Sequence, residues 1–97
     1  MPSYISLINW TDQGVRAAGD TMSRAEAARE VARGVGGELT QIFWTVGAYD
    51  LVIISEFPDD ESLAAFLLRM GVLGNIRTNT LRAHGPDEMT AALRRIG

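Results

Sequence analysis

The feature that most constrains this chain is residues 39–55, where two apolar runs meet at one turn that contains glycine. A two-residue type II′ loop has positive φ at its first central position, which favours Gly, and Gly47-Ala48 supplies that order. The turn therefore predicts a β-hairpin in which Thr45 faces Asp50 and the pairs continue outward from there. Because the turn sets the register, it also sets which side chains share a face.

Both faces of this hairpin are largely apolar, although the second also carries Gln41, Thr45, Asp50 and Glu56. Strict alternation assigns to one face Ile42, Trp44, Val46, Tyr49, Leu51, Ile53 and Phe57, and to the other Leu39, Phe43, Val52 and Ile54. An antiparallel strand pair in a small monomer normally shows water one polar face, so two apolar faces require cover on both sides. We expect helices on one face and a second copy of the chain on the other.

One strand and one helix are predicted before the hairpin. Residues 4–10 are rich in β-forming side chains and predict the first strand. The segment Ser23-Arg24-Ala25-Glu26 has the spacing of a capping box, and we expect a helix from there to about Arg33, ended by glycines. Its apolar stripe is mostly Ala, which predicts a helix that lies close to the sheet.

A second helix, an edge strand and a terminal helix are predicted after the hairpin. Residues 58–62 place acids where the positive end of a helix dipole favours them, and apolar residues then recur at helical spacing to about Gly71. Residues 74–84 contain several Thr and few bulky apolar side chains, which is typical of an edge strand. Pro86 opens a short last helix.

The resulting order is βαββαβ followed by a C-terminal helix, and we expect a single domain over residues 1–97. A ferredoxin-like α+β fold accommodates this order, with a four-stranded antiparallel sheet and right-handed crossovers. The first and third strands are central in that topology. This agrees with the continuously apolar run 51–54 in the third strand.

Composition excludes several classes of function. The formal net charge of -3 argues against an electrostatic nucleic-acid binder, although all nine basic residues are Arg. The absence of cysteine excludes a disulfide scaffold, a thiolate metal site and a cysteine nucleophile. We expect no metal site and no cofactor. No apolar run approaches the roughly 20 residues of a membrane span, and we expect a cytoplasmic protein that does not bind membranes.

Three blocks of sequence, in the same order, resemble the GYD domain family. They are residues 8–14, the turn Gly47-Ala48-Tyr49-Asp50 and residues 74–83. The resemblance covers nearly the whole chain. It implies membership of the ferredoxin-like, dimeric α/β-barrel group, in which two sheets pack face to face, and this agrees with the two apolar faces of the hairpin. It implies no particular biochemical role.

Three residues are candidates for proton transfer. Asp50 suits a base if it is buried against aromatic side chains, since an apolar wall raises the pKa of a carboxyl group. The favoured alternative is a hydrogen bond to Thr45 or to turn amides. Asp12 also has two possible roles: a polar group in a pocket at the end of the first strand, or the side chain of a local Asx-turn. His84, the one histidine, follows the edge strand, and a surface or interface position is favoured because no second His or Cys completes a metal set.

A small-molecule site is the other candidate. Trp10, Trp44 and Tyr49 could wall an aromatic ligand, with Asn9 beside them at the end of the first strand, and core or interface packing is the favoured alternative. Arg77 could bind a carboxylate or phosphate if its face of the last strand looks into a cavity. Solvent or an intersubunit ion pair is its alternative.

The leading hypothesis for function is a small homodimer or higher homo-oligomer that binds a small molecule or acts as a structural module. The first alternative is a cofactor-independent enzyme of the monooxygenase or isomerase kind found on related barrels. The second is an effector-sensing or interaction module. The sequence carries no catalytic signature that decides among them.

Overall fold

The structure is a computed structural model that describes residues 1–97, and its strands and long helices follow the predicted order. The elements are β1 (Ser3–Trp10), α1 (Asp12–Arg16), η1 (Ala18–Asp20), α2 (Thr21–Gly34), β2 (Glu38–Trp44), β3 (Leu51–Glu56), α3 (Asp60–Val72), β4 (Ile76–Ala83) and α4 (Pro86–Arg94). The strands form one antiparallel sheet in the order β2-β3-β1-β4. The fold is therefore α+β and ferredoxin-like, with β1 and β3 central and β4 at an edge, as predicted.

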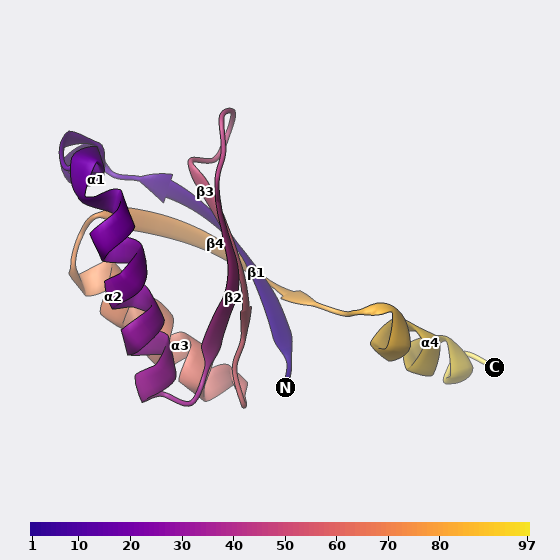
Figure 1. Cartoon of the computed structure of the whole chain (residues 1–97). Coiled ribbons are helices and arrows are strands. Elements are labelled where there is room, and N and C mark those ends of the chain that lie inside the picture. The colour runs from indigo at the N-terminus through magenta and orange to yellow at the C-terminus, as the bar shows by residue number, and fades with distance from the viewer.

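The helices are distributed unequally between the two sides of the sheet. Helices α1, α2 and α3 lie on one side, and α4 stands clear of the sheet on the other side (Figure 1). The radius of gyration is 14.6 Å, compared with about 13 Å for a compact chain of 100 residues. The projecting α4 accounts for the elongated shape, which measures 52 × 30 × 18 Å.

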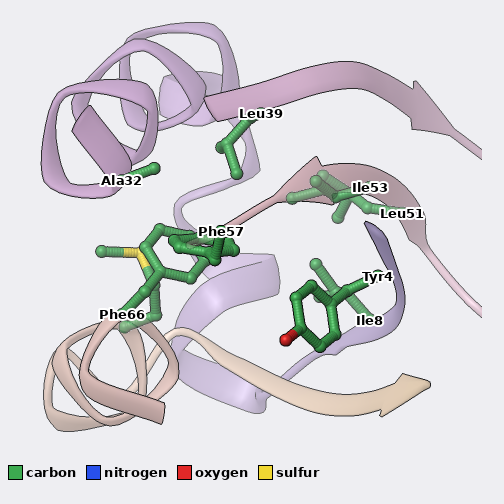
Figure 2. Packing of buried hydrophobic residues seen from close by; sticks show 9 residues of the cluster. Tyr4, Ile8, Ala32, Leu39, Leu51, Ile53, Phe57 and Phe66 are labelled. Carbon is green, nitrogen blue, oxygen red and sulfur yellow. The ribbon is translucent and has the colours of Figure 1, made fainter. Parts of the chain in front are cut away.

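The hydrophobic core lies between the sheet and helices α2 and α3 (Figure 2). Phe57 is fully buried there and packs edge-on to Tyr4, with ring centroids 6.2 Å apart, and against Phe66 at 5.3 Å. Gly37 must remain Gly because a Cβ there would lie 2.3 Å from the Phe57 ring. Ala32, also fully buried, brings the C-terminal half of α2 against this core.

The hairpin has the predicted pairing near its turn and a bulge further out. Trp44 pairs with Leu51, and Gly47 has a positive φ of 146° in the connection. The predicted two-residue type II′ loop is wrong, because the connection spans residues 45–50 and is closed by a hydrogen bond from the Thr45 amide to the Asp50 carbonyl. A register shift between Leu39 and Gln41 interrupts the regular alternation. The prediction that Leu39 shares a face with Phe43 and Val52 is therefore wrong, because the bulge turns Leu39 toward the helices, where it is 1% exposed.

The helix starts agree with the predictions at two of three places. The Asp59 side chain accepts a hydrogen bond from the Ser62 amide at 2.8 Å and caps α3, which holds the pKa of that carboxyl below its usual value. Pro86 opens α4. The predicted capping box at Ser23 is wrong: α2 begins at Thr21, directly after η1, and the Ser23 hydroxyl donates to the Asp20 carbonyl. None of the helices has the length and apolar character to cross a membrane.

Candidate functional site

The side of the sheet away from α2 and α3, the open face, carries two rows of side chains across all four strands. Strand register aligns Phe43, Val52, Leu7 and Asn79 in one row and Gln41, Ile54, Ile5 and Leu81 in the other. Six of these eight are large and apolar. Phe43 and Leu81, on the two edge strands, are 53% and 47% exposed. No helix of the chain covers this surface.

Helix α4 lies on the same side and is itself amphipathic. All of its residues are exposed, including the apolar Met89, Leu93 and the following Ile96. Its attachment is polar: Glu88 accepts from the Arg82 guanidinium at 2.7 Å and from the Gly85 amide at 3.3 Å. The hydrogen bond from Arg82, and after it the hydrogen bond from the Gly85 amide, holds the pKa of Glu88 below its ordinary value. The apolar side of α4 has no partner within the chain.

Arg82 links this attachment to the core. Its guanidinium carbon lies 5.8 Å from the centre of the Tyr4 ring. The Tyr4 hydroxyl in turn donates to the Asp60 carboxylate at 2.5 Å. That hydrogen bond, together with burial, raises the pKa of the Tyr4 phenol. The base of α4 is therefore connected to the start of α3 through β1 and β4.

A cavity of about 290 Å³ lies between the sheet and helices α2 and α3. Twelve of its sixteen lining residues are hydrophobic, among them Ile8 and Trp10 of β1, Ile42 of β2 and Met70 of α3. The wall opposite the sheet is formed by alanines from the first eight residues of α2, which are Ala25, Ala27 and Ala28. The prediction of close approach by an Ala stripe thus holds at the C-terminal end of α2, whereas toward its N-terminus the small side chains leave a space.

The four polar lining residues are Thr21, Arg24, Arg69 and Asn75. The Thr21 hydroxyl accepts a hydrogen bond from the Trp44 indole at 2.9 Å, and the Asn75 side-chain oxygen accepts from the Gln13 amide at 2.9 Å. Neither arginine forms an ion pair. No Asp or Glu lines the cavity. The cavity is therefore apolar inside and carries positive charge without a counter-ion.

Asp50 occupies a structural position at the end of the hairpin. Its carboxylate accepts a hydrogen bond from the Trp10 amide at 2.9 Å, and its own amide donates to the Ile8 carbonyl at 2.8 Å. Thr45, the partner expected for its side chain, donates its hydroxyl to the Tyr49 carbonyl instead. Asp50 thereby joins β3 to β1 at the point where regular pairing ends.

The structure does not bring the three candidates for proton transfer together. Asp12 is exposed in the first turn of α1, which Thr11 caps, and lies at the same end of the sheet as Asp50. His84 is exposed at the other end of the sheet, just after β4. Its Nδ1 atom lies 3.7 Å from a Glu88 carboxylate oxygen. None of the three lines the apolar cavity. No group of three metal-binding side chains occurs in the fold.

The candidate ligand residues are dispersed as well. Only Trp10 lines the cavity. Asn9 donates to the Ala48 carbonyl at 2.8 Å and holds the hairpin connection. Trp44 is partly exposed and hydrogen-bonds to Thr21 from outside the cavity, and Tyr49 is half-buried in the hairpin connection. Arg77 pairs with Asn9 in register and lines a separate pocket at the β4 edge together with Leu67 and Gly74.

Sequence reasoning missed the two arginines at the cavity. Neither Arg24 nor Arg69 is among the candidate residues predicted from the sequence. The available signal was the Ala stripe of α2, because a wall of alanines facing a sheet of larger side chains leaves a gap unless the backbones approach closely. The spacing of α2 from the sheet could not be obtained from the stripe alone.

Comparisons with known proteins agree with this architecture. The chain is 28% identical over 95 residues to the "Glutamine synthetase and cystathionine beta-lyase binding protein" of Thermus thermophilus, a match that covers 97% of this chain and all of that protein. The crystal structure of MtbAldR superposes with a TM-score of 0.69 at 14% identity, over 87% of this chain and 52% of MtbAldR, so this chain spans about half of that protein.

A second crystal structure, TTHA0845 from Thermus thermophilus, has a TM-score of 0.52 at 24% identity and covers 88% of this chain and 95% of its own. Likeness at these identities establishes the fold. The sequence match to a family is more specific, since it extends from the first strand into the last helix. By that match over residues 4–93, the chain belongs to the GYD domain family.

Proposed function

We propose that this protein is a protein-binding module that works as a homodimer, with the open faces of two sheets packed against each other. The observation that supports this most strongly is the open face itself, two rows of mainly apolar side chains with no element of the chain above them. Soluble monomers rarely expose large contiguous apolar patches. A second copy, related by two-fold symmetry, offers a matching surface.

The open face alone is smaller than a typical stable interface, and α4 would supply further contact area. Four strands of six to eight residues present a face of roughly 20 Å by 25 Å, about 500 Å² in projection. A stable interface commonly buries about 800 Å² on each partner. Helix α4 projects on the open side with Met89 and Leu93 exposed, so in the dimer it would extend the contact over the second copy.

A role in binding other proteins draws on the relative from Thermus thermophilus, whose name states that it binds glutamine synthetase and cystathionine beta-lyase. Pairing through the open faces leaves the helical layer of both copies outward. That layer exposes Leu68 and Val72 of α3, at 71% and 83%. These side chains give an outer surface on which a partner enzyme would dock.

Self-association is tested by size-exclusion chromatography with light scattering at micromolar concentration. We expect a dimer, and we expect Leu81→Glu to produce a folded monomer because each interface would then bury a carboxylate at an edge of the open face. Leu68→Glu is the matched control, since it places the same change on the outer layer and should leave the dimer intact. A wild-type monomer would refute the dimer.

Partner binding is tested with the purified glutamine synthetase and cystathionine beta-lyase of the protein's own host. The dimer is immobilised and each enzyme is titrated over it by biolayer interferometry. We expect one of them to bind, and we expect Leu68→Glu to weaken that binding while the dimer persists. Absence of binding to both enzymes would contradict the protein-binding role proposed for this chain.

A further inference from the structure

We infer that the cavity between the sheet and helices α2 and α3 binds a small apolar carboxylic acid. The carboxylate would lie at Arg24 and Arg69, and the apolar part would lie against Trp10 and the alanine wall of α2. This site is inside one chain. It is separate from the open face on which the proposed dimer rests.

The size and lining of the cavity suit such a ligand. Its volume of about 290 Å³ is just below the roughly 300–1,000 Å³ typical of small-molecule sites. Its interior is formed by aliphatic side chains and one indole, with polar groups confined to four residues. A site of this kind takes up an apolar body and orients it through a few polar contacts.

The charge of the cavity selects an anion. Arg24 and Arg69 come from two different helices and both line the same space without an ion-pair partner, in a chain whose net charge is -3. Arg24 stands in the first turn of α2, after the N-cap residue Asp20, and its charge adds to the positive end of the helix dipole. A guanidinium binds a carboxylate through two parallel hydrogen bonds, which gives both affinity and orientation.

The experiment titrates decanoate, at concentrations below micelle formation, into the Trp44→Phe variant, so that Trp10 is the sole tryptophan. Because Trp10 lines the cavity, we expect a saturable change in its emission. Decanol is the matched probe, with the same chain length and no charge. We expect decanol to bind at least about tenfold more weakly, since each charge-assisted hydrogen bond contributes a factor of this order.

Two sets of variants locate the site. Arg24→Gln and Arg69→Gln should each weaken decanoate binding by about tenfold and leave decanol binding unchanged. Arg94→Gln, on α4 and away from the cavity, is the matched control and should change neither. Ala28→Leu should fill the space and abolish binding of both probes, and urea unfolding would show that this variant is folded.

The result can also be separated from the proposed dimer. Leu81→Glu alters the open face and should bind decanoate as the wild type does, whatever its oligomeric state. Equal affinity for decanoate and decanol in the wild type would overturn the inference. So would unchanged decanoate affinity in both arginine variants, or undiminished binding to folded Ala28→Leu.

Discussion

The two faces of the sheet carry similar side chains and differ in what lies on them. On the central strands the helix-covered face includes the buried serines Ser6 and Ser55, whereas the open face has Ile5, Leu7 and Val52. The open face is thus at least as apolar there as the core. Apolar character shows that a face needs cover, and it does not show whether the chain itself or a second molecule supplies that cover.

The largest expected effect comes from truncating one phenylalanine on each face. Phe57→Ala removes a fully buried ring from the core and should lower the free energy of unfolding by about 3–5 kcal/mol. Phe43→Ala, on the open face at 53% exposure, should cost within about 0.5 kcal/mol in a monomer. Urea unfolding at several protein concentrations measures both. A concentration-dependent loss for Phe43→Ala would assign that side chain to the dimer, and equal losses in dilute protein would break the distinction between the faces.

A smaller effect is expected where the covering layer meets the start of β4. A Cβ on Gly14 of α1 would lie 2.0 Å from the Asn75 carbonyl oxygen, so Gly14→Ala should destabilise the fold by about 1–3 kcal/mol. Gly71→Ala is the control, because a Cβ there meets nothing within 4 Å and should add about 0.4–1 kcal/mol. Thermal unfolding compares the two, and a Gly14→Ala protein as stable as wild type would show that α1 packs loosely.

The hairpin anchor should contribute less. Asp50→Ala removes the acceptor for the Trp10 amide and should cost about 1–2 kcal/mol. Asp50→Asn keeps an acceptor oxygen and should recover most of the loss. Chemical denaturation gives both values. A stable Asp50→Ala protein would show that the hairpin end does not need this bond, and would favour the alternative in which the Asp50 carboxylate acts in proton transfer.

The smallest effect concerns α4 on the open side. The Arg82 guanidinium and the Gly85 amide lower the pKa of Glu88, so its stabilising contribution is present above the ordinary pKa of about 4.3 and is lost as pH falls through the folded value. Amide NMR shifts of Gly85 and Glu88, followed between pH 6 and 3, should have a midpoint below the ordinary one. Arg82→Gln should move it upward. An unshifted wild-type midpoint would show that α4 is not held by this pair.

Much of the architecture could be predicted because it depends on local pattern. The order of elements, the hairpin register at Trp44 and Leu51, the acidic start of α3 and the edge position of residues 76–83 all follow from side-chain period, turn residues and charge at helix ends. The bulge beyond Leu39 could not be predicted, because a single extra residue leaves the apolar content of the strand unchanged.

By itself, the sequence determined that this chain forms a four-stranded sheet with apolar side chains on both faces. Only the tertiary structure decided which face is covered, because right-handed crossovers place α2 and α3 together on one side whatever the alternation of the strands. Only the tertiary structure brought Arg24 and Arg69 to one cavity. They are far apart in the sequence, on two helices whose spacing from the sheet depends on how the whole core packs.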